Sequence, residues 1–543
     1  MKMNFKNIFS AVAAAAMLTA CVGDLNTIPL NPTDVTSETA YGADEAGYVQ
    51  GLAKIYFQLT SNNTQDLQVA DGGASEFIRA FWSTQEVTAD AAKCAWGDAW
   101  VNDLNNNTWK GDVLNDAVYA VYVRTLQGIT YVNEYLRQTS DANLDSRGCS
   151  ADVKAKVRQF RAEARFLRAY FYWAAMDTFG QVPFSTEDTQ FGGGYNPPQQ
   201  PREYIFDYVV SELEDLASDA SAMPAAQSNY PRADKGSVLG LLARVYLNAE
   251  VYTGTAKWAE AKAVCEKIYA LGYALAPTHA ELFRGDNGEN ANVKKEFLFA
   301  ASYDAENNQS YGGTTYLTLS TLSSDDGAVN ITGINGGWAG NRVPYEYVAK
   351  FFTDVKSQDY TEGTYEFTDK RAGYFYIKGR TESMQDNLNT FLNGWSCIKF
   401  NNVPHNVDAV EYAATAATKN FSDIDWPLIR LGEIHLIYAE ACMHAGGSAA
   451  AQIKALADRA GVAAPATIDA DFLMAERARE LMWEAHRRTD LIRYGKWISG
   501  YNWTYKGGNF GGQDLPAHFN VFPVPSTELA TNLELQQNPG YAR

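Results

Sequence analysis

The sequence predicts a mainly α-helical protein in which a degenerate tetratricopeptide-like repeat scaffold carries long loop-rich insertions. Residues 113–270 and 426–494 place apolar side chains at three- and four-residue spacing, which is typical of amphipathic helices. Within them, small Ala residues alternate with large aromatics, a pattern that lets paired helices pack closely in repeat arrays. Between the helical regions, Gly, Asn, Ser, Thr and Tyr dominate, which indicates loops and short strands.

The helices follow one another along the chain with short connections. In the helix predicted over 153–179, one face carries Ala162, Phe166, Ala169 and Tyr170, where small and large side chains would interlock. No strict repeat of about 34 residues is visible, so the array is degenerate. The helices predicted within 113–270 cover 113–138, 153–179, 204–217, 235–249 and 256–270, and two more cover 426–444 and 471–494.

Two stretches are predicted to be loop-rich, about 71–109 and 286–425. They contain polar, glycine-containing segments with single aromatic residues, such as the segments around Tyr311 and Trp338. Binding groups usually lie on loops that a rigid scaffold positions. We therefore expect the ligand site to be built from these two stretches.

Residues 1–20 have the parts of a bacterial export signal. Lys2 and Lys6 precede an apolar run that is shorter than the roughly 20 residues a membrane span needs. Small residues then stand directly before Cys21, an arrangement that resembles a lipobox, so we expect Cys21 to be lipidated and to begin the mature chain, 21–543. The alternative is an ordinary cleaved signal with an incidental cysteine.

Composition narrows the class of ligand. The net charge of −19 argues against a nucleic-acid partner, because phosphate binding draws on clustered Lys and Arg, and it favours a neutral or cationic ligand. The five cysteines after Cys21 are widely scattered and show no zinc-type spacing, so we expect buried free thiols.

A set of motifs spread over the whole mature chain resembles the SusD/RagB family. The cysteine at 21 is followed by Asp24-Leu-Asn, and the other motifs keep the family's order. They are Arg161-Ala-Glu-Ala-Arg-Phe-Leu-Arg-Ala, Arg232-Ala-Asp-Lys, Leu242-Ala-Arg-Val-Tyr-Leu-Asn, Trp426-Pro-Leu-Ile-Arg-Leu-Gly-Glu, Glu484-Ala-His-Arg-Arg-Thr-Asp-Leu-Ile-Arg-Tyr-Gly, Phe522-Pro-Val-Pro and Gln537-Asn-Pro-Gly-Tyr.

The resemblance implies a function and a location. Members of this family are glycan-capturing lipoproteins at the outer surface of the outer membrane in Bacteroidetes, and they are not enzymes. They act as a lid on a SusC-like TonB-dependent transporter and work beside other surface glycan-binding lipoproteins and amylases. By this resemblance 21–543 forms a single domain, anchored through Cys21, that binds starch or maltooligosaccharides.

Starch-binding members of the family also imply the site residues. Matched by local motif, the ligand would lie on an arc formed by Trp96, Tyr311 and Trp338, with Arg79 and Asp71 reaching sugar hydroxyls at its edge. One position departs from the pattern. An Asn is expected three residues after Trp96, where this chain has Ala99, and Asn102 is a candidate to compensate.

Elementary chemistry agrees with an aromatic site. The C–H faces of sugar rings lie well on flat aromatic rings, while sugar hydroxyls need a few hydrogen-bond partners. For any single tryptophan the alternative is ordinary core packing. We expect core or rim positions for Trp82, Trp100 and Trp109, which lack motif support.

A calcium site is a further hypothesis, although no cofactor is required. Asp423 and Asp425 offer the hard oxygen ligands that calcium prefers, and the resemblance places calcium ligands at these two positions. The third ligand position falls on Gly288, so Asp286 or a backbone carbonyl would substitute. The alternative is that paired Asp residues before a helix act as caps.

Three alternatives to α-glucan capture remain. One is the same role with another glycan, and the second is a glycoside hydrolase, which needs a pair of carboxylates at a defined separation. Asp71 is the only acid that can be placed at the predicted site, and no Ser/His/Asp or HExxH pattern is present, so we expect no enzyme activity. The third, a pure protein-interaction scaffold, leaves the loop aromatics unexplained.

Overall fold

The computed structural model describes residues 37–62, 67, 69, 72–189, 196–385, 387–415 and 419–543. The predicted signal segment, the lipidation site Cys21 and the predicted edge residue Asp71 lie outside these residues. No helix among the residues described is both long enough and apolar enough to span a membrane.

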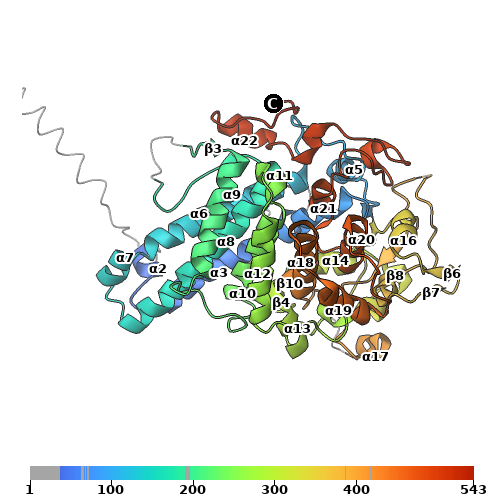
Figure 1. Ribbon diagram of the computed structural model, residues 1–543, viewed down its shortest axis with the longest axis horizontal. Coiled ribbons are helices and arrows are strands. Elements are labelled where there is room, and N and C mark those ends of the chain that lie inside the picture. Colours follow the sequence, from blue (N-terminus) through green and yellow to red (C-terminus); the bar gives the residue numbers. More distant parts are fainter. Residues whose placement is uncertain are drawn as a thin grey trace, which may run out of the picture.

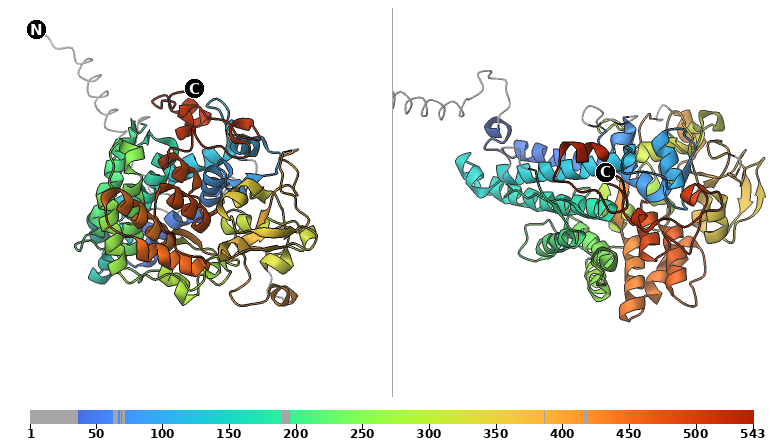
Figure 2. Two further views of the ribbon diagram at one scale, coloured as in Figure 1. Left: turned by 45° about the vertical axis from the view of Figure 1, so that its right-hand side comes forward. Right: turned by 90° about the horizontal axis from the view of Figure 1, so that it is seen from above.

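The scaffold is an array of helices in which each one packs against the next. Helix α6 packs on α8, α8 on α9, α9 on α10, and α10 on α12, so these helices follow one another in space as in sequence, and α18, from much later in the chain, packs on α12. Figure 1 shows α6, α8, α9, α10 and α12 in cyan and green on one side of the molecule with α18 beside them in brown, and the right-hand view of Figure 2 shows the molecule from above. The array confirms the predicted fold class. Its helices are α6 (Asp116–Gln138), α8 (Ala151–Phe179), α9 (Arg202–Ala217), α10 (Lys235–Leu247), α12 (Trp258–Ala270) and α18 (Leu431–Ala445).

The starts of these helices and their packing follow from the sequence. The side chains of Asn115, Ser150 and Asp234 accept hydrogen bonds from backbone N–H groups in the first turns of α6, α8 and α10. Such caps are each worth about 1 kcal/mol. On α8 the predicted face of Ala and aromatic residues is buried, and Phe166 meets Phe299 edge to face at 5.0 Å.

An additional helix, α3 (Ala46–Thr60), was not predicted and packs on α6 and α8. Its face toward the array carries Tyr48, Leu52 and Ile55, all buried. The same helix leaves Phe57 45% exposed on its other side.

The predicted helix 426–444 is wrong in its first five residues. Trp426–Arg430 forms strand β10, which pairs antiparallel with β4 (Phe297–Ala301), and the helix begins only at Leu431. All five residues of β10 are buried, so both faces of the strand are covered, and the charge of Arg430 is met by Glu296, Glu480 and Glu484. Pro427 also lacks the N–H that a helix interior would use.

The predicted helix 471–494 is broken in the middle. It divides into α20 (Ala470–Glu480) and α21 (Arg487–Arg493), and Trp483 and Ala485 between them adopt positive φ angles of 64° and 63°. The break turns Glu484 toward the interior, where its carboxylate accepts a 2.6 Å hydrogen bond from Arg430 Nε. A buried charge needs such a partner, and a continuous helix would not supply it.

The two loop-rich stretches meet at a short antiparallel ladder. Strand β1 (Lys93–Cys94) pairs with β5 (Asn341–Arg342), with Cys94 opposite Asn341. Stretch 71–109 is more helical than expected, since it includes α4 (Phe77–Trp82), a π-helical turn (Ser83–Val87) and α5 (Ala99–Asn106). Stretch 286–425 consists of short elements, among them α14 (Gly313–Leu319), α16 (Tyr345–Phe351), β6 (Lys356–Asp359), β7 (Thr364–Glu366) and α17 (Ala409–Ala414).

Other predictions about the core are confirmed. Trp82, Trp100 and Trp109 are 0%, 7% and 2% exposed. The five cysteines after Cys21 are all buried free thiols: Cys94, Cys149, Cys265, Cys397 and Cys442.

Candidate functional site

Three aromatic rings from distant parts of the loop-rich region lie together at the surface. The Tyr311 ring is 6.1 Å from that of Trp338 and 4.9 Å from that of Phe421, measured between ring centroids. Tyr311 is 52% exposed, and the other two rings are half-buried. Apolar surface of this extent on an otherwise polar loop is suited to contact with a ligand.

Phe421 is a site residue that the sequence did not indicate. It precedes the Ser-Asp-Ile-Asp segment, which drew attention only for its carboxylates. Its approach to the other rings depends on a long-range contact, in which Asn335 N–H donates to the Lys419 carbonyl at 2.8 Å and their segments bridge at Ile334. Local sequence carries no signal for that pairing.

Trp96 lies next to this group through the β1–β5 ladder. Beyond the paired residues, Ala95 N–H donates to the Gly340 carbonyl at 2.8 Å, so the segments holding Trp96 and Trp338 run together. Gly340 has a φ of 115°, and a Cβ there would stand only 2.5 Å from Trp96 Nε1. A glycine is therefore required for the Trp96 ring to lie over this backbone.

Arg79 lies behind the rings rather than at an open edge. It is 3% exposed, and its guanidinium stands 4.3 Å from the Tyr316 ring centroid and 5.5 Å from that of Trp96. Tyr316 in turn meets Trp96 edge to face at 5.8 Å. This packing holds the Trp96 ring in place, and contact of Arg79 with sugar hydroxyls stays a prediction.

A buried carboxyl fixes the Tyr311 loop. Glu76 is 0% exposed, and its two oxygens are hydrogen-bonded to the hydroxyls of Tyr303 and Ser310. Ser310 Oγ also accepts the Gly312 N–H at 3.0 Å, and Gly312 packs directly on Glu76. Burial raises the pKa of Glu76 to about 8, with the hydroxyl hydrogen bonds and Arg124 acting in the opposite direction.

Near Trp96, the predicted candidate Asn102 supplies an amide group, while Ala99 supplies none. Ala99 is exposed and offers no side-chain hydrogen bond. Asn102 lies close by, where its Nδ2 donates to the Gly97 carbonyl at 3.3 Å and its Oδ1 is 3.5 Å from Asn389 Nδ2. Amide groups are therefore present near this ring.

The three aspartates of the predicted calcium site line one cavity of ≈ 630 Å³ together with Glu289 and Asp304. Their oxygens accept hydrogen bonds from protein groups: Asp425 from Tyr230 Oη at 2.6 Å, Asp423 from Lys419 Nζ at 3.2 Å, and Asp286 from His405 N–H at 2.8 Å. Burial raises the pKa of Asp425 to about 6.

Each of the three carboxylates thus already accepts a hydrogen bond from a protein group. Among the residues that the structure describes, no group of three or more His, Cys, Asp or Glu side chains could hold a metal ion. The carboxylates therefore do not form a preformed calcium site, and calcium binding stays a prediction.

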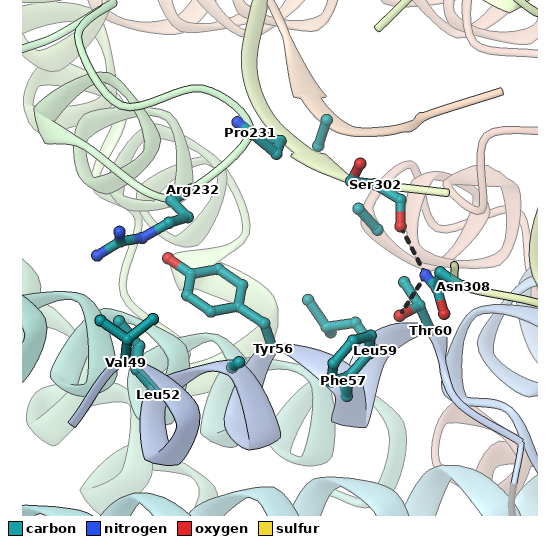
Figure 3. Close-up of a pocket in the computed structure, with 13 residues that line it drawn as sticks. Val49, Leu52, Tyr56, Phe57, Leu59, Thr60, Pro231, Arg232, Ser302 and Asn308 are labelled. Carbon is teal, nitrogen blue, oxygen red and sulfur yellow. Dashed lines mark hydrogen bonds between the residues drawn. The ribbon is translucent and has the colours of Figure 1, made fainter. Parts of the chain in front are cut away.

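A separate apolar cavity of ≈ 200 Å³ lies beside α3 (Figure 3). Tyr56 and Phe57 line it from α3, and Pro231 and Arg232 from the opposite side. Asn308 closes one end, with its Nδ2 donating to Thr60 Oγ1 at 3.1 Å and to the Ser302 carbonyl at 2.9 Å. The cavity is distinct from the aromatic site, which lies beyond the Tyr311 loop.

Comparison with known proteins gives consistent matches along the chain. A family model described as "SusD family" matches residues 295–541, and one described as "Starch-binding associating with outer membrane" matches 63–247. The chain is similar to "Starch-binding protein SusD" of Bacteroides thetaiotaomicron, with 29% identity covering 99% of both chains. It is also similar to "SusD-like protein P2" of Formosa agariphila, with 26% identity over 88% of this chain and 93% of that one.

Solved structures show the same fold at lower identity. A SusD superfamily protein from Parabacteroides distasonis superposes with a TM-score of 0.67 at 20% identity, covering 94% of this chain and 100% of that one. A surface glycan-binding protein A from Bacteroides thetaiotaomicron, in complex with laminarihexaose, gives 0.65 at 17% identity, covering 91% and 99%. Two family models, a relative matched over its full length and a shared architecture agree, and the chain belongs to the SusD/RagB family.

Proposed function

We propose that this protein captures α-1,4-glucan chains on its aromatic site and passes them to a TonB-dependent outer-membrane transporter. The observation that carries the proposal is the contact of Tyr311, Trp338 and Phe421 at the surface, with Trp96 just beyond the adjoining strand β1. The rings are already positioned without a ligand, because buried groups fix the segments that carry them.

The energetics favour weak but useful binding. A sugar face that buries on the order of 100 Å² on one ring gives about 2.5 kcal/mol before costs. Loss of ligand freedom removes much of this, so several rings must act on one chain. Neighbouring rings are tilted by 50° and 48°, so they present a bent rather than a flat surface, which suits a ligand that curves.

The choice of α-glucan rests on a relative and not on geometry alone. The relative with 29% identity over its full length is named a starch-binding protein. The structures with bound or named laminarin ligands are 17% and 19% identical to this chain, and they support the fold only. A different glycan in the same family role is the second candidate.

Lipidation at Cys21, a surface location on the outer membrane and partnership with a SusC-like transporter belong to the same proposal. They are supported by the signal-like residues 1–20 and by the family model whose description includes association with the outer membrane.

We also propose that the protein is not an enzyme. Glycoside hydrolysis requires two carboxyl groups flanking the bond, about 5–10 Å apart. One carboxyl next to the rings, Glu76, is 0% exposed behind the Tyr311 loop, and Asp98, two residues after Trp96, is exposed. Incubation of pure protein with starch, pullulan or maltooligosaccharides should release no reducing ends, and steady release that a single carboxylate substitution abolishes would contradict the proposal.

Binding is tested by titrating maltoheptaose and α-cyclodextrin into wild type and into Trp96→Ala, Trp338→Ala and Tyr311→Ala. Each variant should lose roughly 1–3 kcal/mol of binding if its ring is a central anchor. Phe367→Ala is the matched control, because Phe367 is 42% exposed on the β6–β7 side of the molecule.

Thermal melting separates binding from folding in these variants. Normal melting with lost binding supports the proposal, and wild-type affinity in all three ring variants refutes it. A laminarin and xylan panel with the same proteins decides between α-glucan and another glycan.

A further inference from the structure

The loop 387–394 is fixed beside Trp96 by a buried arginine. Arg342 is 1% exposed and follows Asn341 on β5, the strand that pairs with the Trp96 segment. Its guanidinium donates to the carbonyls of Leu388, at 2.6 Å, Asn393, at 2.7 Å, and Thr390. One side chain thus sets the path of almost the whole loop relative to the ladder.

Asn389 at the turn of this loop contacts the Trp96 segment directly. Its Nδ2 donates to the Ala95 carbonyl at 3.0 Å and lies 3.4 Å from the Trp96 carbonyl. The residue is exposed, and its Oδ1 accepts no hydrogen bond from any residue that the structure describes. An oriented amide oxygen therefore stands next to Trp96 with its acceptor capacity available to a ligand hydroxyl.

The same loop carries apolar surface. Phe391 is 42% exposed and Leu392 48% exposed, between the polar residues Thr390 and Asn393. Two neighbouring exposed apolar side chains on a loop that is held in place offer contact area to a ligand.

We propose that loop 387–394 forms an additional sugar subsite beyond Trp96, in which Asn389 Oδ1 accepts a hydroxyl and Phe391 contacts the sugar face. This rests on the proposed α-glucan function and extends it. Ring contacts join Phe421 to Tyr311 and Tyr311 to Trp338. Backbone pairing joins the Trp338 segment to that of Trp96, and loop 387–394 contacts the Trp96 segment through Asn389. A glucan chain that already covers the first rings would reach loop 387–394 only with further glucose units.

The subsite predicts a dependence on ligand length. Wild-type affinity should rise from maltotriose to maltoheptaose, and Asn389→Ala and Phe391→Ala should each lower affinity about fivefold for maltoheptaose, the effect of one lost contact. Both should leave maltotriose affinity unchanged, because a short ligand occupies the central rings. Phe367→Ala should change neither value.

The outcomes separate the subsite from the function beneath it. Unchanged maltoheptaose affinity in both variants overturns the subsite while leaving the α-glucan site in place. Equal losses for maltotriose and maltoheptaose also overturn it, since the loop would then act on the central site. Absence of α-glucan binding by wild type overturns both proposals. Losses confined to the longer ligands, with normal melting temperatures, establish the subsite.

Discussion

Replacing Glu76 by glutamine tests whether a buried carboxyl both holds the Tyr311 loop and makes stability depend on pH. Glu76 is fully buried, hydrogen-bonded to Tyr303 and Ser310, and its pKa is raised to about 8, chiefly by burial. At neutral pH the group is therefore mostly protonated, and glutamine copies its shape and its neutral state. We expect Glu76→Gln to fold and to bind α-glucan at pH 7 much as wild type does.

The sign and size of the pH effect follow from linkage. The folded pKa of about 8 lies above the ordinary value of 4.5, so the unfolded chain loses this proton first. The stabilising contribution is complete below pH 4.5, falls as the pH rises, and is lost above pH 8. Between pH 6 and pH 9 the calculated loss is roughly 2.5 kcal/mol. For a chain of 543 residues this corresponds to about 2 °C in melting temperature.

Melting curves of wild type and Glu76→Gln between pH 6 and pH 9 measure this loss. Two other groups titrate in the same pH range, Glu86 with a pKa also raised to about 8 and Lys93 with a pKa lowered to about 7. As the pH rises, the first lowers the stability of the folded protein and the second raises it. Only the difference between the two proteins is therefore informative. Melting temperatures that fall in parallel for both would refute the assignment to Glu76. Glu76→Ala, which removes both hydroxyl contacts, should in contrast weaken glucan binding at every pH.

Three further predictions concern other parts of the molecule. Phe421→Ala should lower maltoheptaose affinity about as much as Tyr311→Ala, because the two rings are in contact, and an unchanged affinity in titration calorimetry would place Phe421 outside the site. Calcium, if it binds at Asp286, Asp423 and Asp425, should raise the melting temperature of wild type but not of Asp423→Asn, whereas equal curves with calcium and with a chelator would count against the site. Cys21 should carry acyl chains in protein isolated from outer membranes, and a mass spectrum of an unmodified mature N-terminus would reject lipidation.

The helical scaffold was predictable because its signal is local. The three- and four-residue spacing in α6, α8, α9 and α12 extends over several turns, and the observed starts differ from the predicted ones by only two or three residues. The errors lie where tertiary contacts decide. The apolar spacing of Trp426–Arg430 does not by itself distinguish a buried strand from a buried helix, and its partner strand is far away in sequence. The break after Glu480 depends on the position of Arg430, which no local pattern reveals.

The candidate site was predictable only in part, for a related reason. Motif resemblance named Trp96, Tyr311 and Trp338, and the structure brings Tyr311 and Trp338 into contact. The motif resemblance could not indicate Phe421, because its neighbours come from a pairing of distant loops. It also could not indicate that Arg79 is buried, because that burial results from packing against Tyr316.

Preorganisation of the aromatic rings explains why several buried polar contacts lie beneath the exposed aromatic site. Each ring-bearing segment is held by a buried polar contact: Tyr311 through Glu76, Trp96 through the Gly340 carbonyl, and the Asn389 loop through Arg342. Burying a carboxyl or a guanidinium costs free energy, and this cost is borne when the protein folds and not when the ligand binds. A ligand that binds weakly releases too little free energy to order a flexible loop as well. When the loop is already fixed, more of the free energy of ring stacking appears as affinity. Substitutions that remove these contacts, such as Glu76→Ala and Arg342→Ala, should therefore weaken binding even though neither side chain lies at the exposed surface.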